Sequence, residues 1–142
     1  MVGQNVAQVL QGRSLGVRDW GEEILLGYVS SSFTLKKLIL KKNSRGGLQF
    51  HRKKNEMAYL ISGVLKVRFE TDEGELAETF VTAGQAIHFP VGCVHQEIAV
   101  TDCEIIEVST PFLNDRVRVE AEFGEEADFG LPSTSAEEIE EL

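Results

Sequence analysis

The 142-residue sequence predicts an all-β domain, either a sandwich or a closed barrel, made of about eight to ten short strands. Apolar runs of strand length are separated by turn signals at intervals of about 8 to 12 residues. No convincing amphipathic helix lies between these runs, which excludes a βαβ topology. The hydrophobic content of 42% and the chain length suffice for a single core.

The expected strands follow one another from about Ile24 onward. Turn-forming residues rich in Gly, Asn, Asp and Ser separate them, for example at 43–47, at Ser62-Gly63 and at 71–74. The apolar runs predicted as strands are 33–40, 57–61, 64–69, 76–81, 86–89, 94–100 and 103–108.

The two ends of the chain have a different character from the centre. Residues 1–17 are weakly patterned and predict an arm or helix that packs on the domain or on a partner subunit. The domain itself is assigned to residues 18–125. Residues 126–142 form an acidic tail, in which Ser135 could cap a short helix unless the end is mobile.

Charge and composition narrow the classes of partner. The net charge of −9 argues against nucleic acid, which needs a positive binding face. No apolar run reaches the roughly 20 residues of a membrane span, and no signal peptide is evident, so we expect a cytoplasmic protein without a membrane partner. Lysines and arginines concentrate in residues 36–54 and suit an anionic small-molecule substrate, although solvated strand ends would explain most of them equally well.

Four side chains have the chemistry and spacing of metal ligands: Gln49, His51, Glu56 and His95. Residues two apart in a strand face the same side, so Gln49 and His51 would both point inward. Imidazole, carboxylate and amide oxygen suit a divalent metal ion, with Zn²⁺ the first choice and Fe²⁺, Mn²⁺, Co²⁺ or Ni²⁺ as alternatives. Cys93 lies close to His95, and we interpret it as a small buried residue rather than a fifth ligand.

These spacings resemble the two signature motifs of the cupin superfamily. Glu56 and Gly63 fit the Glu-x6-Gly step of the first motif, His51 fits its second histidine, and Gln49 replaces the first. Gly84, Pro90, Gly92 and His95 fit the second motif, whose final Asn is Ala99 here. The resemblance implies a single-domain cupin, a double-stranded β-helix or jelly-roll barrel, with a metal site. A cupin whose site is empty or degenerate is the alternative.

Within the cupins, residues 18–124 look most like the isomerase domain of type II mannose-6-phosphate isomerases. The shared features are Arg18-Asp19-Trp20-Gly21, Lys36-Lys37-Leu38 leading to Leu48-Gln49-Phe50-His51, and Asp115-Arg116-Val117-Arg118 for the family's Asp-Ile-Val-Arg. Gln in the place of the first histidine is normal for that group. The chain departs from the group at Lys54 (Arg in the family), Phe123 (Tyr) and Glu125 (Arg).

An isomerase of this type needs cations for the phosphate and a base that moves a proton between adjacent carbons. We assign Arg118 and Lys36 as the main phosphate or carbonyl contacts, Lys54 as a further substrate contact and Glu120 as the base. Trp20 would wall the pocket. For each charged residue the alternative is an ordinary surface position, and for Trp20 it is the core.

Three functions follow from this interpretation. The first is a metal-dependent sugar-phosphate isomerase of the mannose 6-phosphate/fructose 6-phosphate type. The second is a cupin that binds a carbohydrate or sugar nucleotide without turnover, and the third is another metal-cupin activity, such as a dioxygenase or lyase. The N-terminal arm and the need to cover edge strands predict a homodimer.

Overall fold

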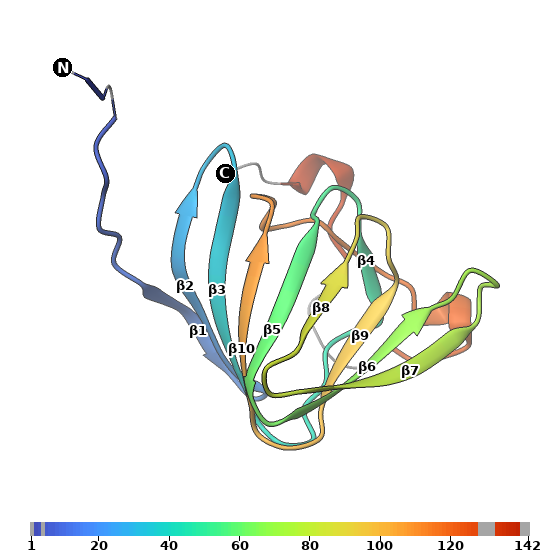
Figure 1. Ribbon diagram of the computed structural model, residues 1–142. Coiled ribbons are helices and arrows are strands. Elements are labelled where there is room, and N and C mark those ends of the chain that lie inside the picture. The colour runs from blue at the N-terminus through green and yellow to red at the C-terminus, as the bar shows by residue number, and fades with distance from the viewer. Residues whose placement is uncertain (1, 4, 128–132, 140–142) are drawn as a thin grey trace.

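The strands pair into two antiparallel sheets that face each other in the computed structural model, which describes residues 2–3, 5–127 and 133–139 (Figure 1). One sheet has the order β1 (Arg13–Arg18), β2 (Gly21–Val29), β3 (Phe33–Leu40), β10 (Cys103–Ser109), β5 (Glu56–Ser62), β8 (Ala86–Phe89). The other has the order β11 (Arg116–Arg118), β4 (Gln49–His51), β9 (His95–Ala99), β6 (Val64–Glu70), β7 (Leu76–Thr82). The predicted all-β barrel is therefore confirmed.

The inner and outer faces of the six-stranded sheet follow the two-residue period of a strand. In β5 the side chains of Glu56, Ala58 and Leu60 are buried, whereas the alternate residues Met57 and Tyr59 are exposed. The inner face of β5 thus begins with a carboxylate and continues with apolar residues.

The interior between the sheets is divided in the same way. Apolar side chains of both sheets, among them Leu60, Leu65, Val67, Phe89 and Ile105, form the main core. Glu56 instead lines a cavity, together with the inward-facing polar residues Lys36 of β3 and Glu107 of β10. Burial of the apolar side chains stabilises the barrel. The polar side chains line the cavity, where a ligand could bind.

The turn between β5 and β6 requires a glycine at position 63, the last residue of the first motif. Gly63 has φ +93°, and a Cβ atom there would lie 2.2 Å from the backbone oxygen of Asp102. Only glycine accepts both the positive φ and this close approach. The final glycine of the first motif therefore serves the fold and does not contact the site.

The N-terminal arm is shorter than the 17 residues we assigned to it. Residues 13–17 belong to β1, which pairs with β2 through a register shift between Ser14 and Gly16. Residues 5–12, which precede β1, extend away from the barrel (Figure 1), and Val6 and Val9 among them are exposed. The apolar pattern of 13–17 is too weak to indicate a strand, which is held by hairpin pairing with β2.

Part of the acidic tail is fixed against β11. The backbone N–H of Thr134 donates to the Arg116 carbonyl oxygen at 2.7 Å, and Thr134 is buried. A single 3₁₀ turn, η2 (Ala136–Glu138), follows, with the Ser135 N–H 3.3 Å from Glu138 Oε2. Ser135 thus caps one 3₁₀ turn in the described part of the tail, for which we expected either a short helix or a mobile end. A first 3₁₀ turn, η1 (Ala121–Phe123), follows β11, while residues 128–132 and 140–142 of the predicted tail lie outside the described residues.

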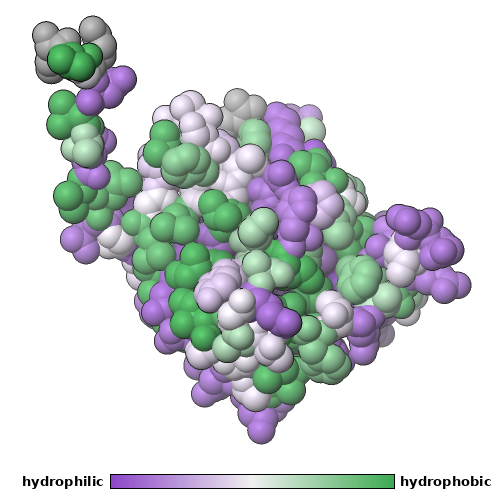
Figure 2. All heavy atoms as spheres, in the orientation of Figure 1, coloured by the Kyte–Doolittle hydropathy of each residue, from purple (hydrophilic) through white to green (hydrophobic). Residues whose placement is uncertain are grey.

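The outer face of the six-stranded sheet carries an apolar surface (Figure 2). We define it by seven exposed side chains on β2, β3, β5 and β10: Tyr28, Phe33, Leu35, Met57, Tyr59, Ile61 and Val108. A patch of this kind marks an interaction site more often than a bare surface. Within the described residues, no helix is long and apolar enough to cross a membrane.

Candidate metal centre

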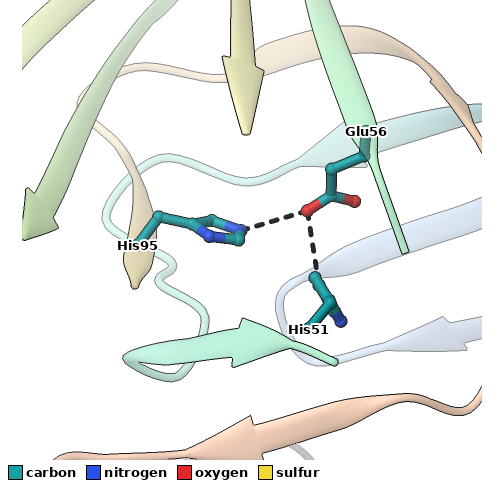
Figure 3. A group of neighbouring side chains, drawn as sticks. All are labelled: His51, Glu56 and His95. Atoms are coloured by element: carbon teal, nitrogen blue, oxygen red, sulfur yellow. Dashed lines mark ion pairs between the residues drawn. The ribbon is translucent and has the colours of Figure 1, made fainter. Parts of the chain in front are cut away.

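Three of the four predicted ligands converge in the cavity (Figure 3). Glu56 Oε1 lies 3.3 Å from His51 Nε2 and 3.1 Å from His95 Nε2. The three side chains come from β4, β5 and β9 and are all buried. One ligand atom from each lies within 4.8 Å of the others, so this group could hold a metal ion.

The two imidazoles are oriented by backbone carbonyl groups. His51 Nδ1 lies 3.0 Å from the carbonyl oxygen of Asp115, and His95 Nδ1 lies 3.0 Å from that of Cys93. Burial would lower the pKa of His95, but its hydrogen bonds with Cys93 and Glu56 outweigh that effect and raise the pKa to about 10, so its Nε2 also carries a hydrogen and donates to Glu56 Oε1. A carbonyl oxygen can only accept, so each Nδ1 carries a hydrogen and each Nε2 atom is directed toward Glu56. This is the arrangement by which a protein prepares histidines as metal ligands.

The two motif segments contact each other directly. Gln49 of β4 is the register partner of His95 in β9, and the backbone N–H of Gly92 donates to the His51 carbonyl oxygen at 2.9 Å. The turn from Pro90 to Cys93 is closed by a 3.0 Å hydrogen bond. Cys93 contributes its carbonyl group to the orientation of His95.

The donor set fits a divalent ion. Gln49 lines the same cavity as the His-Glu-His group, where an amide oxygen could add a fourth donor. Two imidazole nitrogens and a carboxylate oxygen suit several first-row divalent metals, which agrees with the set expected from the sequence and does not single out one of them.

A buried lysine holds the other oxygen of Glu56. Lys54 Nζ lies 2.9 Å from Glu56 Oε2 and 3.5 Å from Glu107 Oε1. Burial alone would raise the pKa of Glu56, but the Lys54 ammonium and the hydrogen bonds to His51 and His95 outweigh it and hold that pKa well below its usual range. Glu56 therefore stays ionised, with Oε1 directed toward the two histidines.

Two further carboxyl groups near the centre titrate close to neutrality. Burial and the nearby Glu56 charge raise the pKa of Glu97 to about 7. The same two causes, in the same order, raise the pKa of Glu107 to about 8. Both residues line the cavity, so the centre contains groups that can take up or release a proton near pH 7.

Asp115 organises the loop between β4 and β5. Its carboxylate accepts hydrogen bonds from the backbone N–H groups of Arg52 (3.2 Å), Lys53 (2.6 Å) and Lys54 (2.8 Å). Its own carbonyl oxygen accepts from His51, as described above. One buried residue thus positions a histidine of the candidate metal centre and the loop that carries Lys54.

The cavity around the centre has a volume of about 440 Å³. Of the residues predicted to contact substrate, Lys36, Lys54 and Trp20 line it. Lys36 pairs with Glu23, with 2.8 Å between Nζ and Oε1. Trp20 thus lies in the cavity wall, while its contact with a substrate stays a prediction.

Arg118 and Glu120, predicted as a phosphate contact and a base, pair with each other outside the cavity wall. Arg118 Nε donates to Glu120 Oε1 at 2.9 Å, and neither residue is among those that line the cavity. Glu120 is buried and also accepts from the Leu48 N–H at 3.1 Å. Burial would raise the pKa of Glu120, but the hydrogen bond from Arg118 outweighs it and lowers that pKa.

Four residues with a role at the site escaped the sequence reasoning: Glu97, Glu107, Asp115 and Arg116. Glu97 could have been found, because it stands two residues after His95 in the same strand and therefore faces the same side. Arg116 could have been found likewise, since Arg116 and Arg118 alternate with Val117. The positions of Glu107 and Asp115 depend on long-range pairing.

Comparison with known proteins agrees with this architecture. Residues 7–124 match the family described as Cupin. No curated protein has a significant match to the chain.

Solved structures share the fold at low sequence identity. KdgF from Halomonas sp. is 16% identical, with a TM-score of 0.60, over 68% of this chain and 84% of that protein. CapF, a capsular polysaccharide assembling protein from Staphylococcus aureus, is 24% identical, with a TM-score of 0.61, over 68% of this chain and 28% of CapF. A variant of oxalate decarboxylase from Bacillus subtilis is 18% identical, with a TM-score of 0.69, over 94% of this chain and 45% of that protein. This chain therefore spans less than half of the latter two proteins.

Proposed function

The chain belongs to the cupin family, and from this premise we propose that it is a metal-dependent sugar-phosphate isomerase of the mannose 6-phosphate/fructose 6-phosphate type. The observation that carries the proposal is the convergence of His51, Glu56 and His95 in a cavity that also contains a carboxyl group with a pKa near neutrality. The sequence resemblance to type II mannose-6-phosphate isomerases supports the choice of substrate.

The reaction requires a proton to move from C2 to C1 and the hydroxyl proton of O2 to pass to O1. Glu97, with a pKa of about 7, is suited to take the proton from C2 of the aldose and to return it to C1 of the enediol. A divalent ion held by His51, Glu56, His95 and Gln49 would supply charge stabilisation to the carbonyl and neighbouring hydroxyl oxygens. Lys36 and Lys54 add positive charge to the same cavity.

This assignment moves the proposed base from Glu120 to Glu97. Glu120 is paired with Arg118, and its lowered pKa suits a permanently ionised structural carboxylate better than a base that works near pH 7. Roles of Arg118 and Glu120 in the reaction stay predictions, which would require that pair to separate.

The experiment compares wild type with two single histidine variants. His95→Ala removes a ligand, whereas His88→Ala removes the remaining histidine, which is exposed and hydrogen-bonded to Asn55. We expect wild type and His88→Ala to bind about one divalent ion per chain and to convert mannose 6-phosphate to fructose 6-phosphate. We expect chelator and His95→Ala to abolish both properties. Turnover that survives both changes would refute the metal mechanism.

A second candidate is a cupin that binds a carbohydrate or sugar nucleotide without turnover. The observation that favours it concerns Glu125, which stands where the isomerases have an arginine and whose Oε1 accepts from Arg68 Nη1 at 2.9 Å. An acidic side chain held in this way cannot replace a phosphate-binding arginine. Thermal stabilisation by such a ligand, with metal bound and with no product formed, would support this candidate over the isomerase.

A further inference from the structure

The cations of the cavity differ in whether they have an acidic partner. Lys36 pairs with Glu23 and Lys54 pairs with Glu56 and Glu107. For Arg116, which lines the same cavity, the described part of the chain provides no ion pair, and its buried Nε atom has no hydrogen-bond partner. Arg116 is therefore a half-buried cation of the cavity wall whose Nε–H has no acceptor among the described residues.

A buried N–H donor without an acceptor lowers the stability of the folded protein, and this applies to the Nε–H of Arg116. Burial lowers the pKa of Arg116, and the positive charges of Arg118 and Arg18 lower it further. The carboxylates of Glu23 and Glu56 act on that pKa in the opposite direction. Arginine does not lose its proton under ordinary conditions, so the guanidinium stays charged. A bound anion would accept hydrogen bonds from its N–H groups and compensate its charge. The isomerase pattern Asp-Ile-Val-Arg has an apolar isoleucine at this position, so the arginine is a feature of this chain.

Arg116 is also placed where a ligand of the metal centre would reach it. In the pairing of β11 with β4, Arg116 is the register partner of His51. Side chains of paired residues share a face of the sheet, so the guanidinium lies beside the His-Glu-His group. Arg18 of β1, an exposed residue, lines the same cavity.

We propose that Arg116, assisted by Arg18, is the anion-binding site of the cavity and selects small molecules that carry a phosphate or carboxylate group. A guanidinium offers two parallel N–H donors that match the oxygens of either group. The proposal rests on the proposed function only in that the ligand occupies the same cavity. It does not depend on isomerisation.

The test uses the metal-loaded protein and calorimetric or ligand-observed NMR titrations. The probes are inorganic phosphate, mannose 6-phosphate, glucuronate and uncharged mannose, so that phosphate, carboxylate and neutral ligands are compared. The variants are Arg116→Gln, Arg116→Lys and, as a matched control, Arg13→Gln, whose exposed arginine is on β1 but does not line the cavity.

We expect Arg116→Gln to weaken binding of the anionic probes by about 10- to 100-fold while metal content and binding of mannose stay unchanged. Arg116→Lys should recover part of the loss, because it restores charge without the paired donors. Arg13→Gln should behave as wild type. A larger loss for mannose 6-phosphate than for glucuronate would identify phosphate as the selected group, and the reverse would identify carboxylate.

Three results would overturn the proposal. These are anion binding that is unchanged in Arg116→Gln, equal losses for anionic and neutral sugars, and no binding of any anionic probe to wild type at millimolar concentration. Binding that depends on Arg116 without turnover of mannose 6-phosphate would refute the isomerase proposal alone. Turnover that is indifferent to Arg116 would refute this one alone.

Discussion

The carbonyl oxygen of Asp115 accepts a hydrogen bond of 3.0 Å from Nδ1 of His51, while the carboxylate of the same residue accepts three backbone N–H groups of the loop that follows β4. A ligand histidine and the loop carrying Lys54 are thus held by one buried side chain and its backbone. Such supporting contacts fix the geometry in which a metal ion is bound.

Asp115→Ala should both destabilise the protein and weaken its metal binding. Three buried or half-buried N–H donors would lose a charged acceptor, so we expect the free energy of unfolding to fall by about 2–4 kcal/mol. Displacement of His51 should weaken metal binding by about 10- to 100-fold. Urea denaturation and metal titration measure the two effects.

The matched control is Asp102→Ala, because Asp102 also accepts a backbone N–H, from Lys42 at 2.8 Å, but at an exposed position. We expect this variant to lose less than about 1 kcal/mol and to bind metal normally. Metal affinity that is unchanged in Asp115→Ala would contradict the supporting role.

Lys54→Met should strongly destabilise the metal-free protein. Glu56 is ionised and its Oε2 lies 2.9 Å from the Lys54 ammonium, so removal of Lys54 leaves the inward-facing charge of Glu56 uncompensated. The expected loss is about 3–5 kcal/mol in the free energy of unfolding. Chemical denaturation in the presence of chelator is the measurement.

Two control variants test whether the charge and the burial of Lys54 cause this loss. Lys54→Arg keeps the charge and should recover most of the stability. Lys66→Met removes a lysine that pairs with Glu78 at 3.6 Å on the surface, and it should cost less than about 1 kcal/mol. Equal effects of Lys54→Met and Lys66→Met would show that burial of the Lys54 pairs is unimportant.

Glu107 should make the stability of the metal-free protein depend on pH. Its pKa of about 8 in the folded chain lies above the ordinary value of 4.5, so the folded state binds the proton more tightly than the unfolded state. The stabilisation is complete below about pH 4.5 and is lost as the pH rises through 8, with a slope of up to about 1.4 kcal/mol per pH unit.

Glu107→Gln should remove this contribution. Wild type and variant should have similar stability near pH 5, and wild type should become progressively less stable than the variant toward pH 8. Glu104→Gln on the outer face of the same strand, where Glu104 pairs with Lys37 at 3.5 Å, should leave the wild-type pH dependence unchanged. Parallel profiles for wild type and Glu107→Gln would count against the raised pKa.

The predicted homodimer should form through the apolar surface of the six-stranded sheet. Its seven exposed side chains are about 40–50% accessible, and half-exposed side chains of this size leave on the order of 80 Å² each to water. Their sum of roughly 600 Å² is comparable with the ~800 Å² per partner of a standard interface. Light scattering should give about twice the 15.7 kDa chain mass.

The double variant Met57→Glu/Tyr59→Glu should shift the protein to the monomer mass, because burial of two carboxylates opposes association. Phe80→Glu is the control, since Phe80 is 58% exposed on β7, outside this surface. A monomeric wild type at micromolar concentration, or dissociation by Phe80→Glu alone, would exclude this interface.

Most of the strands, and the three residues of the candidate metal centre, were predictable from local sequence pattern. The predicted strands 33–40 and 86–89 coincide with β3 and β8, because alternation of exposed and buried residues is written in consecutive residues. His51, Glu56 and His95 were predictable because motif spacing fixes which strand, and which face of it, carries each ligand. The strand at 13–18 was missed, since its apolar pattern is weak and its stability comes from pairing with β2.

The surroundings of the centre were decided by tertiary structure. The sequence by itself determined an all-β cupin and three convergent candidate ligands, since both depend on the two-residue period of a strand and on short turns. Whether a charged residue is a substrate contact or part of an ion pair depends on its distance from residues far away in the chain. The pairing of Lys54 with Glu107 arises only when sheets and loops meet in three dimensions, and so does the position of Arg116, which has no ion pair among the described residues.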